Sequence, residues 1–330
     1  MPTMRAAYAA SINPDDPLAG LEVGEQPEPV PHGDDWMTVT VRASSLNHHD
    51  IWSLRGVGLA ADQLPMILGC DAAGVDEAGN EVIVHSVIGD PSAGGSGTGD
   101  ETLDPKRSLL SERFPGTHAE QVAVPRRNLV PKPEQLTWAE AACLPTAWLT
   151  AYRMLVVKGR VGAGNSVLVQ GAGGGVATAA VVLGLALGAR VYATSRDPAK
   201  RERVAALGAT AVEPGARLPE RVDAVIETVG AATIEHSLKC TKQGGRIVVS
   251  GSTSGHLATV DLRRLFFLQQ EILGSTMGTR EELAALVDLC AERGIRPVVD
   301  SVYGFAQVRD AFEKLYSGDV FGKVVLEMVV

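Results

Sequence analysis

The chain has 330 residues, more than one compact hydrophobic core usually holds, and this length predicts two domains. Hydrophobic residues make up 45% of the sequence and charged residues 21%, which excludes a disordered chain, a coiled coil or a fibre. The formal net charge of −9 provides no diffuse basic surface, so we expect neither nucleic acid nor a membrane as a partner, and any bound anion must be held locally.

The first 125 residues contain short runs typical of antiparallel strands, separated by Pro and Gly. These runs lie at 38–45, 72–88 and 119–125, and they predict a compact β-rich domain. Between them, residues 89–115 are rich in glycine and polar residues and poor in apolar ones. We expect this segment to be a long exposed loop.

From residue 126 the pattern changes to alternating helices and strands. Thr137 and Glu140 have the spacing of a capping box, and Pro145 should kink or split the helix that starts there. Because the strands have apolar runs and are separated by helices, they predict a parallel, doubly wound six-stranded sheet in an α/β protein. The expected strands lie at 166–172, 189–196, 209–214, 221–230, 245–251 and 271–278.

A glycine-rich turn, Gly171 to Ala177, joins the first of these strands to a helix. Glycine permits the sharp turn and lets backbone N–H groups approach a pyrophosphate, which the N-terminus of the helix then stabilises. This placement predicts a dinucleotide site with Gly171, Gly174, Gly175 and Val176 at the turn. The alternative is a flexible turn in an α/β protein.

The end of the next strand indicates which dinucleotide is bound. Ser195, Arg196 and Lys200 stand where an acid would otherwise accept hydrogen bonds from the ribose 2′-hydroxyl. A guanidinium can pair with a 2′-phosphate, so NADPH is favoured over NADH. In the alternative interpretation, Asp197 contacts the ribose and Arg196 merely faces solvent.

Further cofactor contacts are expected where the other parallel strands end, because bound dinucleotides collect at that edge of the sheet. These residues are Thr228, Val229, Gly230, Ser250, Gly251, Thr276 and Met277.

Several segments together resemble the medium-chain dehydrogenase/reductase superfamily, most closely its zinc-free quinone oxidoreductase-like branch. The resemblance implies a GroES-like β domain from residues 1–125 and 279–330, a Rossmann domain at 126–278, and an active-site cleft between them. It also implies a homodimer formed through the strand at 271–278. The matching segments are 41–56, 65–82, 116–125, 140–155, 171–177, 223–230, 274–283 and 322–326.

The resemblance also shows where zinc ligands would lie. Zinc alcohol dehydrogenases of this superfamily use a Cys, a His-Glu pair and a second Cys, and the corresponding residues here are Asn47, Cys70 with Asp71, and Thr146. Asn and Thr are poor zinc ligands, so we expect no metal. The structural-zinc loop would fall near 89–115, which contains no cysteine.

A rearranged metal site built from His48, His49, Cys70 and Asp71 is the alternative, because all four are metal-capable residue types. However, adjacent side chains usually diverge, so His48 and His49 are not expected to face the same ion.

Without a Lewis acid, a quinone or an α,β-unsaturated carbonyl is the easier hydride acceptor, because the charge spreads into a phenolate or enolate. By resemblance, Asn47 is expected to donate a hydrogen bond in the catalytic site, and Asp50 to be structural or to contact the ribose. His49 is the other obvious titratable group of this segment, and the alternative is a surface histidine or one with a structural hydrogen bond. Trp52 can supply an apolar wall. Thr150 and Lys323 are implied as cofactor contacts, with less support.

The leading hypothesis is an NADPH-dependent, zinc-free oxidoreductase that reduces a small-molecule quinone or enone. The alternatives are an enoyl-thioester reductase, an alcohol or aldehyde dehydrogenase, and a non-catalytic NADPH-binding protein. The N-terminal residues do not have the pattern of a secretion signal, and 176–189 is too short to span a bilayer, so a cytoplasmic location is expected.

Overall fold

The computed structural model describes residues 2–92 and 99–328, and the chain forms two compact units. Unit 1 combines Met1–Thr146 with Gly278–Val330, and unit 2 is Ala147–Met277. The sequence analysis placed the changes of domain after residues 125 and 278, whereas the two units change after Thr146 and Met277. The predicted loop at 89–115 includes residues 93–98, which lie outside the described residues.

Unit 1 is built around mainly antiparallel sheets, as predicted, although β17 and β18 pair in parallel. In the largest sheet the strand order is β10-β6-β5-β3-β18-β17, and β9 also pairs with β3. The C-terminal strand β18 pairs antiparallel with β3, so Val325 lies opposite Ser45 and the two ends of the chain share one sheet. Smaller sheets have the orders β2-β1-β4 and β7-β8.

The bounds of the strands of unit 1 are β1 Thr3–Ala9, β2 Leu21–Pro27, β3 Trp36–Ser45, β4 Met66–Ile67, β5 Asp71–Asp76, β6 Glu81–Val84, β7 Val87–Ile88, β8 Ser108–Leu109, β9 Gln121–Pro125, β10 Leu129–Pro131, β17 Val299–Gly304 and β18 Lys323–Glu327.

Alternation along the strands of unit 1 produces its core. Val39 and Val41 of β3 point inward and are buried with Phe312, which lies on a helix near the C-terminus. The α-helices of this unit are α1 His48–Leu54, α2 Trp138–Ala142, α8 Arg280–Arg293 and α9 Val308–Ser317. Short 3-10 turns lie at Pro17–Gly20, Ala61–Gln63, Glu101–Leu103, Arg126–Asn128 and Phe305–Gln307.

The expected capping box and helix break are both present near the start of the second half. Thr137 Oγ1 accepts a hydrogen bond from Glu140 N at 3.2 Å, and Glu140 Oε2 accepts one from Thr137 N at 2.8 Å. Helix α2 ends at Ala142, and a wider π-helical turn, Leu144–Trp148, contains Pro145. After α3, Leu149–Tyr152, a second π-helical turn covers Arg153–Lys158.

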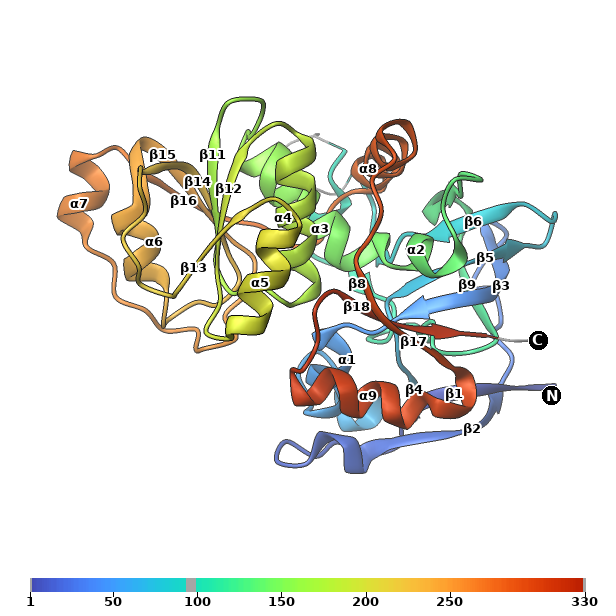
Figure 1. The fold of residues 1–330 in the computed structure, drawn as a ribbon. Coiled ribbons are helices and arrows are strands. Elements are labelled where there is room, and N and C mark those ends of the chain that lie inside the picture. The colour runs from blue at the N-terminus through green and yellow to red at the C-terminus, as the bar shows by residue number, and fades with distance from the viewer. Residues whose placement is uncertain (1, 93–98, 329–330) are drawn as a thin grey trace. The chain divides into compact units, whose positions relative to one another are not determined.

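Unit 2 contains the predicted six-stranded parallel sheet, with the order β13-β12-β11-β14-β15-β16. This is the doubly wound order of a Rossmann domain. Figure 1 shows α4 and α5 beside β12 and β13, and α6 beside β14 and β15. Buried apolar residues such as Leu168, Val225 and Ile247 form the core on these strands.

The strands of unit 2 are β11 Ser166–Val169, β12 Arg190–Thr194, β13 Thr210–Val212, β14 Val222–Glu227, β15 Thr241–Val249 and β16 Glu271–Gly274. Its remaining α-helices are α4 Gly175–Ala186, α5 Pro198–Ala206, α6 Ile234–Cys240 and α7 Leu262–Phe267.

Part of the segment 89–115 differs from the exposed loop that the sequence predicted. Glu101 and Leu110 are fully buried, and Glu101 Oε1 accepts a hydrogen bond from Arg280 N at 2.8 Å. A polar sequence was therefore misinterpreted as solvent-exposed, because this carboxylate satisfies the N-terminal end of α8. In the part of the chain that the structure describes, no helix is long and apolar enough to cross a membrane.

Candidate functional site

The glycine turn of unit 2 has a backbone that only glycine adopts easily. Gly171 has φ +76°, and a Cβ there would lie 2.6 Å from Val229 Cγ2. Gly173 has φ +122°, and a Cβ there would lie 2.8 Å from Lys200 Cδ. Side chains at either position would therefore collide with neighbours as well as strain the backbone.

Helix α4 begins at this turn with Gly174 as its N-cap, and no side chain caps it. Gly174 and Gly175 are half-buried, as is Val176 in the first turn. A Cβ at Gly174 would meet nothing within 4 Å, so the space in front of the helix is open. An open glycine cradle at an uncapped helix N-terminus fits the pyrophosphate of a dinucleotide.

Two polar residues whose contacts with the turn were not predicted, Gln170 and Thr194, hold it in place. Gly171 N donates to Thr194 Oγ1 at 3.0 Å, and Thr194 Oγ1 donates to Gln170 Oε1 at 2.8 Å. Both side chains are buried. Gln170 and Thr194 could have been predicted from their positions at the carboxyl ends of β11 and β12, because polar residues there lie at the same edge of the sheet.

The residues predicted to select NADPH lie together after β12. Arg196 is exposed, whereas Ser195 is buried and its Oγ accepts a hydrogen bond from Asp197 N at 3.2 Å. Asp197 caps α5, since its Oδ1 accepts from Ala199 N at 2.9 Å. Asp197, which the alternative interpretation assigned to the ribose, is thus engaged with the helix. Arg196, by contrast, is exposed to solvent.

Two further cations lie around this loop. The side chain of Lys200 lies over the glycine turn, next to Gly173. Arg201, which was not predicted, donates from Nη1 to Ser195 O at 2.8 Å and to Arg196 O at 3.2 Å. The one feature of the sequence that could have indicated Arg201 is its position in the first turn of α5.

The turn after β14 is organised by a buried carboxylate, Glu227, that the sequence analysis also missed. Its Oε1 accepts from Val229 N at 2.8 Å and from Gly230 N at 3.0 Å, and Thr233 Oγ1 donates to the same oxygen at 2.9 Å. The half-buried residues Thr228, Val229 and Gly230 are therefore fixed at the carboxyl end of the strand.

The next strand end is tied to this turn. Ser250 N donates to Glu227 O at 3.0 Å, and a Cβ on Gly251 would lie 2.7 Å from Thr228 O. The close approach requires glycine at position 251. Four predicted residues of two adjacent strands, Thr228, Gly230, Ser250 and Gly251, are thus brought together.

The remaining predicted cofactor residues of unit 2 differ in exposure. Thr276 is exposed, whereas Met277 is 7% exposed with φ +48°. Thr150 is 6% exposed on α3, which packs against α4. Only Thr276 of these three presents a side chain openly to solvent.

In unit 1, α1 carries most of the residues predicted to be catalytic. Asp50 is fully buried; its Oδ2 accepts from Asn47 N at 2.8 Å, its Oδ1 accepts from Gly69 N at 3.1 Å, and His118 Nε2 lies 3.4 Å from Oδ2. Burial raises the pKa of Asp50, but His118, His49 and the Asn47 N–H together lower it below its usual value. Asp50 therefore orients the start of α1 as a buried carboxylate.

Lys323, which the resemblance implied as a cofactor contact, lies in a buried polar cluster of unit 1. It is 3% exposed, and its Nζ donates to Leu46 O and Asn47 Oδ1, both at 2.6 Å, and to Asp71 Oδ2 at 3.2 Å. Asn47 Nδ2 donates to Asp71 Oδ2 at 2.8 Å and to Ser45 O at 3.3 Å. The amide of Asn47 is thus engaged within the protein.

These contacts test whether the residues at the expected zinc positions fit a metal ion. Asn47 and Asp71 surround an ammonium group, whereas Cys70 Sγ is directed elsewhere and donates to Leu110 O at 3.2 Å. Across residues 2–92 and 99–328, no group of three or more His, Cys, Asp and Glu side chains could hold a metal ion. The side chains at the expected zinc positions do not fit zinc, and of those proposed for a rearranged site only His49 and Cys70 are in contact.

His49 is held between a carboxylate and a thiol. Its Nε2 lies 3.1 Å from Glu112 Oε1, and its Nδ1 lies 3.4 Å from both Cys70 Sγ and Ser111 Oγ. Burial lowers the pKa of His49, but the contacts with Cys70 and Glu112 raise it by more than burial lowers it. The pKa of His49 therefore stands well above its usual value. Burial also raises the pKa of Cys70. The sequence contained no signal for Glu112.

The side chains at the surface of α1 are His48, which is exposed, and Trp52, which is 39% exposed. His49 retains 19% exposure of its side chain. The structure therefore leaves His49 and Trp52 accessible, and buries Asn47 and Asp50.

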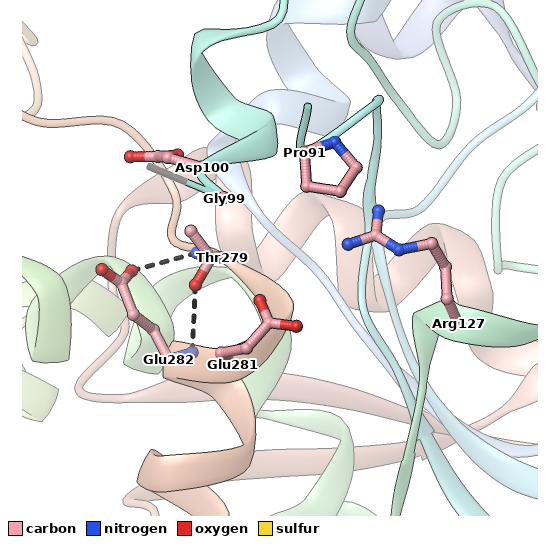
Figure 2. Close-up of a pocket in the computed structure, with 7 residues that line it drawn as sticks. All are labelled: Pro91, Gly99, Asp100, Arg127, Thr279, Glu281 and Glu282. Atoms are coloured by element: carbon pink, nitrogen blue, oxygen red, sulfur yellow. Dashed lines mark hydrogen bonds between the residues drawn. The ribbon is translucent and has the colours of Figure 1, made fainter. Parts of the chain in front are cut away.

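A cavity of about 390 Å³ lies in another part of unit 1 and is shown in Figure 2. It is lined by Asp100, Arg127 and the start of α8, where Thr279 and Glu282 form a capping box with hydrogen bonds of 3.0 and 3.1 Å. None of the residues predicted for the functional site lines this cavity.

Comparison with known proteins identifies the family. Residues 33–134 match the alcohol dehydrogenase GroES-like domain, and residues 201–326 match the zinc-binding dehydrogenase family. A solved NAD-dependent alcohol dehydrogenase is 34% identical, with a TM-score of 0.90 over 99% of this chain and 100% of that one. The chain belongs to the medium-chain dehydrogenase/reductase superfamily, a family of oxidoreductases.

Other members of this superfamily that the chain resembles act on acyl thioesters, according to their names. The crotonyl-CoA carboxylase/reductase of Cereibacter sphaeroides is 28% identical over 91% of this chain and 81% of the relative. The 2-octenoyl-CoA carboxylase reductase CinF, solved in complex with NADP and 2-octenoyl-CoA, is 27% identical in sequence to this chain. Its structure matches with a TM-score of 0.90 over 99% of this chain and 88% of that one.

Proposed function

We propose that this protein is an NADPH-dependent, zinc-independent reductase that acts on the C=C bond of an α,β-unsaturated carbonyl compound. The observation that carries the proposal is the engagement of Asn47 and Asp71 with the buried ammonium of Lys323. These two side chains stand where the family resemblance puts zinc ligands, and a lysine, not an ion, is their partner. Conjugate reduction needs less stabilisation of developing negative charge than carbonyl reduction does, because the charge is delocalised over an enolate.

Unit 2 holds the cofactor in this proposal. The glycine cradle and the N-terminus of α4 bind the pyrophosphate, and Arg196 with Ser195 receives the 2′-phosphate. The bound nicotinamide supplies the hydride. The Asp197 carboxylate caps α5, so it is engaged with the helix and not held ready for a ribose 2′-hydroxyl, which supports NADPH over NADH.

Unit 1 supplies the polar groups for the carbonyl in this proposal. The Glu112 carboxylate holds His49, whose raised pKa keeps the imidazole protonated near neutral pH. An imidazolium can stabilise the oxygen of a developing enolate and donate the proton that the product requires. Trp52 offers an accessible apolar face beside it for a flat substrate.

Enoyl thioesters are the substrate class that we favour, and quinones are the second class. The support is the similarity to reductases named for crotonyl-CoA and 2-octenoyl-CoA, whose substrates are conjugated thioesters. The lysine-filled cluster also disfavours an alcohol dehydrogenase, which would need another way to stabilise a localised alkoxide.

NADPH oxidation over a panel of enoyl thioesters, enones, quinones and saturated aldehydes tests the proposal. We expect turnover with conjugated acceptors and little with saturated aldehydes. Turnover of saturated aldehydes alone would overturn it in favour of an alcohol dehydrogenase, and tight NADPH binding without any turnover would favour a non-catalytic protein.

We further propose that the protein is a homodimer joined at the edge strand β16. The support is that α7 and β16 both carry exposed apolar side chains: Phe266 is 68%, Phe267 74% and Ile272 38% exposed. Exposed apolar side chains and an unpaired strand edge are both suited to association. Light scattering should give a dimer for the wild type and a monomer for Phe267→Asp; a monomeric wild type would contradict this.

A cytoplasmic location is also proposed. All four cysteines are buried free thiols in the structure, as is usual in a reducing compartment. Recovery of the native protein mainly in an extracellular or periplasmic fraction would overturn it.

A further inference from the structure

The guanidinium of Arg55 is held between two aromatic rings at the end of α1. Its Cζ lies 5.2 Å from the centroid of the Trp52 ring and 5.8 Å from that of Tyr316 on α9. Trp52 and Tyr316 are 39% and 44% exposed, so the stack lies at the surface of unit 1. Stacking on two rings fixes the orientation of a side chain that would otherwise be flexible.

This guanidinium has no acidic partner among the described residues. No hydrogen bond or ion pair of the Arg55 side chain is present there, and its Nε is buried without an acceptor. Two other cations of unit 1 that lie over aromatic rings differ in this respect. Arg5 lies over Phe305 and is paired with Glu120 at 2.8 Å, and Lys132 lies over Trp138 and is paired with Glu81 at 2.8 Å.

Arg55 is the C-cap of α1, the helix that carries the proposed proton donor. Trp52 follows His49 by three residues and Arg55 follows Trp52 by three, so each pair is about one helical turn apart. At a rise of about 1.5 Å per residue, His49 and Arg55 are roughly 9 Å apart along the helix. Arg55 is therefore too distant to act on the carbonyl that His49 contacts.

We propose that Arg55, stacked on Trp52 and Tyr316, binds an acidic group of the substrate, a phosphate or a carboxylate, that lies away from the reacting double bond. A guanidinium forms paired charge-assisted hydrogen bonds with either oxyanion, and its orientation is already fixed in the free protein. The proposal rests on the function proposed above and narrows it to acceptors that carry a remote negative charge.

Three acceptors separate the possible sources of that charge. Crotonyl-CoA carries phosphates, 4-oxopent-2-enoate carries a carboxylate, and 3-penten-2-one is neutral. Steady-state kinetics with NADPH would compare the wild type with Arg55→Met, which keeps an unbranched apolar stem and removes the charge. Arg113→Met is the matched control, because Arg113 is an exposed arginine 5.8 Å from the Phe114 ring.

We expect Arg55→Met to raise KM for one of the charged acceptors by about tenfold or more, with little change in kcat. With the neutral acceptor, Arg55→Met should change KM by less than about twofold. Arg113→Met should have the KM and kcat of the wild type with all three acceptors. A preference for crotonyl-CoA identifies a phosphate, and a preference for the keto acid identifies a carboxylate. Equal losses on all three acceptors, or no loss on either charged one, would overturn the proposal.

Direct binding separates this inference from the proposed reaction. Calorimetric titration with coenzyme A and with 4-oxopentanoate, neither of which is a conjugated acceptor, should show weaker binding of one of them to Arg55→Met. Arg55-dependent binding without any turnover would refute the reductase and keep the anion site. If conjugated acceptors are turned over but binding does not depend on Arg55, the reductase is kept and the anion site is refuted.

Discussion

Lys323 and Asp71 form an ion pair in the interior of unit 1, with Nζ 3.2 Å from Oδ2 and side chains that are 3% and 0% exposed. Because both charges are shielded from water, removing one leaves the other buried without compensation. We predict that Lys323→Met destabilises the protein by about 3–5 kcal/mol in urea unfolding. Lys323→Met combined with Asp71→Asn should recover part of that loss.

The exposed pair Lys239 and Glu235 is a suitable control, since their side chains are 62% and 76% exposed. Lys239→Met should change the free energy of unfolding by less than about 1 kcal/mol. If Lys323→Met costs no more than Lys239→Met, the ion pair does not hold the cluster as described.

The contact between His49 and Glu112 predicts the pH dependence of turnover. A raised pKa keeps His49 protonated at neutral pH, so kcat/KM should fall as the pH rises through that pKa. Glu112→Gln removes one of the groups that raise the pKa and should shift this fall to lower pH. A His49→Gln variant should lack it altogether. An unshifted profile in Glu112→Gln would show that another group donates the proton.

The glycine turn offers a test with a closely matched control. Gly171 and Gly215 have similar φ angles, +76° and +82°, but a Cβ at Gly171 would lie 2.6 Å from Val229 whereas one at Gly215 would meet nothing within 4 Å. Both alanine variants carry backbone strain of about 1–2 kcal/mol. Only Gly171→Ala should also weaken NADPH binding, by about tenfold or more, in fluorescence titrations. Equal affinities would argue against a pyrophosphate at this turn.

Arg196 is predicted to discriminate between the two nicotinamide cofactors. Arg196→Ala should raise the Kd for NADPH by about tenfold or more and leave that for NADH nearly unchanged, because only NADPH carries the 2′-phosphate. Arg217→Ala, another exposed arginine of unit 2, should change neither value. Equal effects of Arg196→Ala on both cofactors would remove the basis for choosing NADPH.

Those features of the fold that depend on local pattern were predicted from the sequence. The six parallel strands and the turn from Gly171 into α4 follow from apolar runs and glycine spacing, which involve neighbouring residues only. The glutamate of the His49 contact was not predicted, because it lies 63 residues away in a segment without a strong pattern.

Contacts between distant segments explain the other differences. Lys323 is 252 residues from Asp71, and the sequence did not predict their contact. Its burial follows from the pairing of β18 with β3, which brings its side chain to Asn47. No periodicity in either strand specifies that pairing, so the composition of the polar cluster could be seen only in the folded chain.

The most direct test of the central claim is the identity of the product formed from crotonaldehyde and NADPH by metal-free protein. Gas chromatography distinguishes butanal, formed by reduction of the C=C bond, from crotyl alcohol, formed by reduction of the carbonyl. The proposed conjugate reduction predicts butanal, at a rate that added zinc does not increase. Crotyl alcohol as the main product, or activity that appears only with zinc, would contradict it.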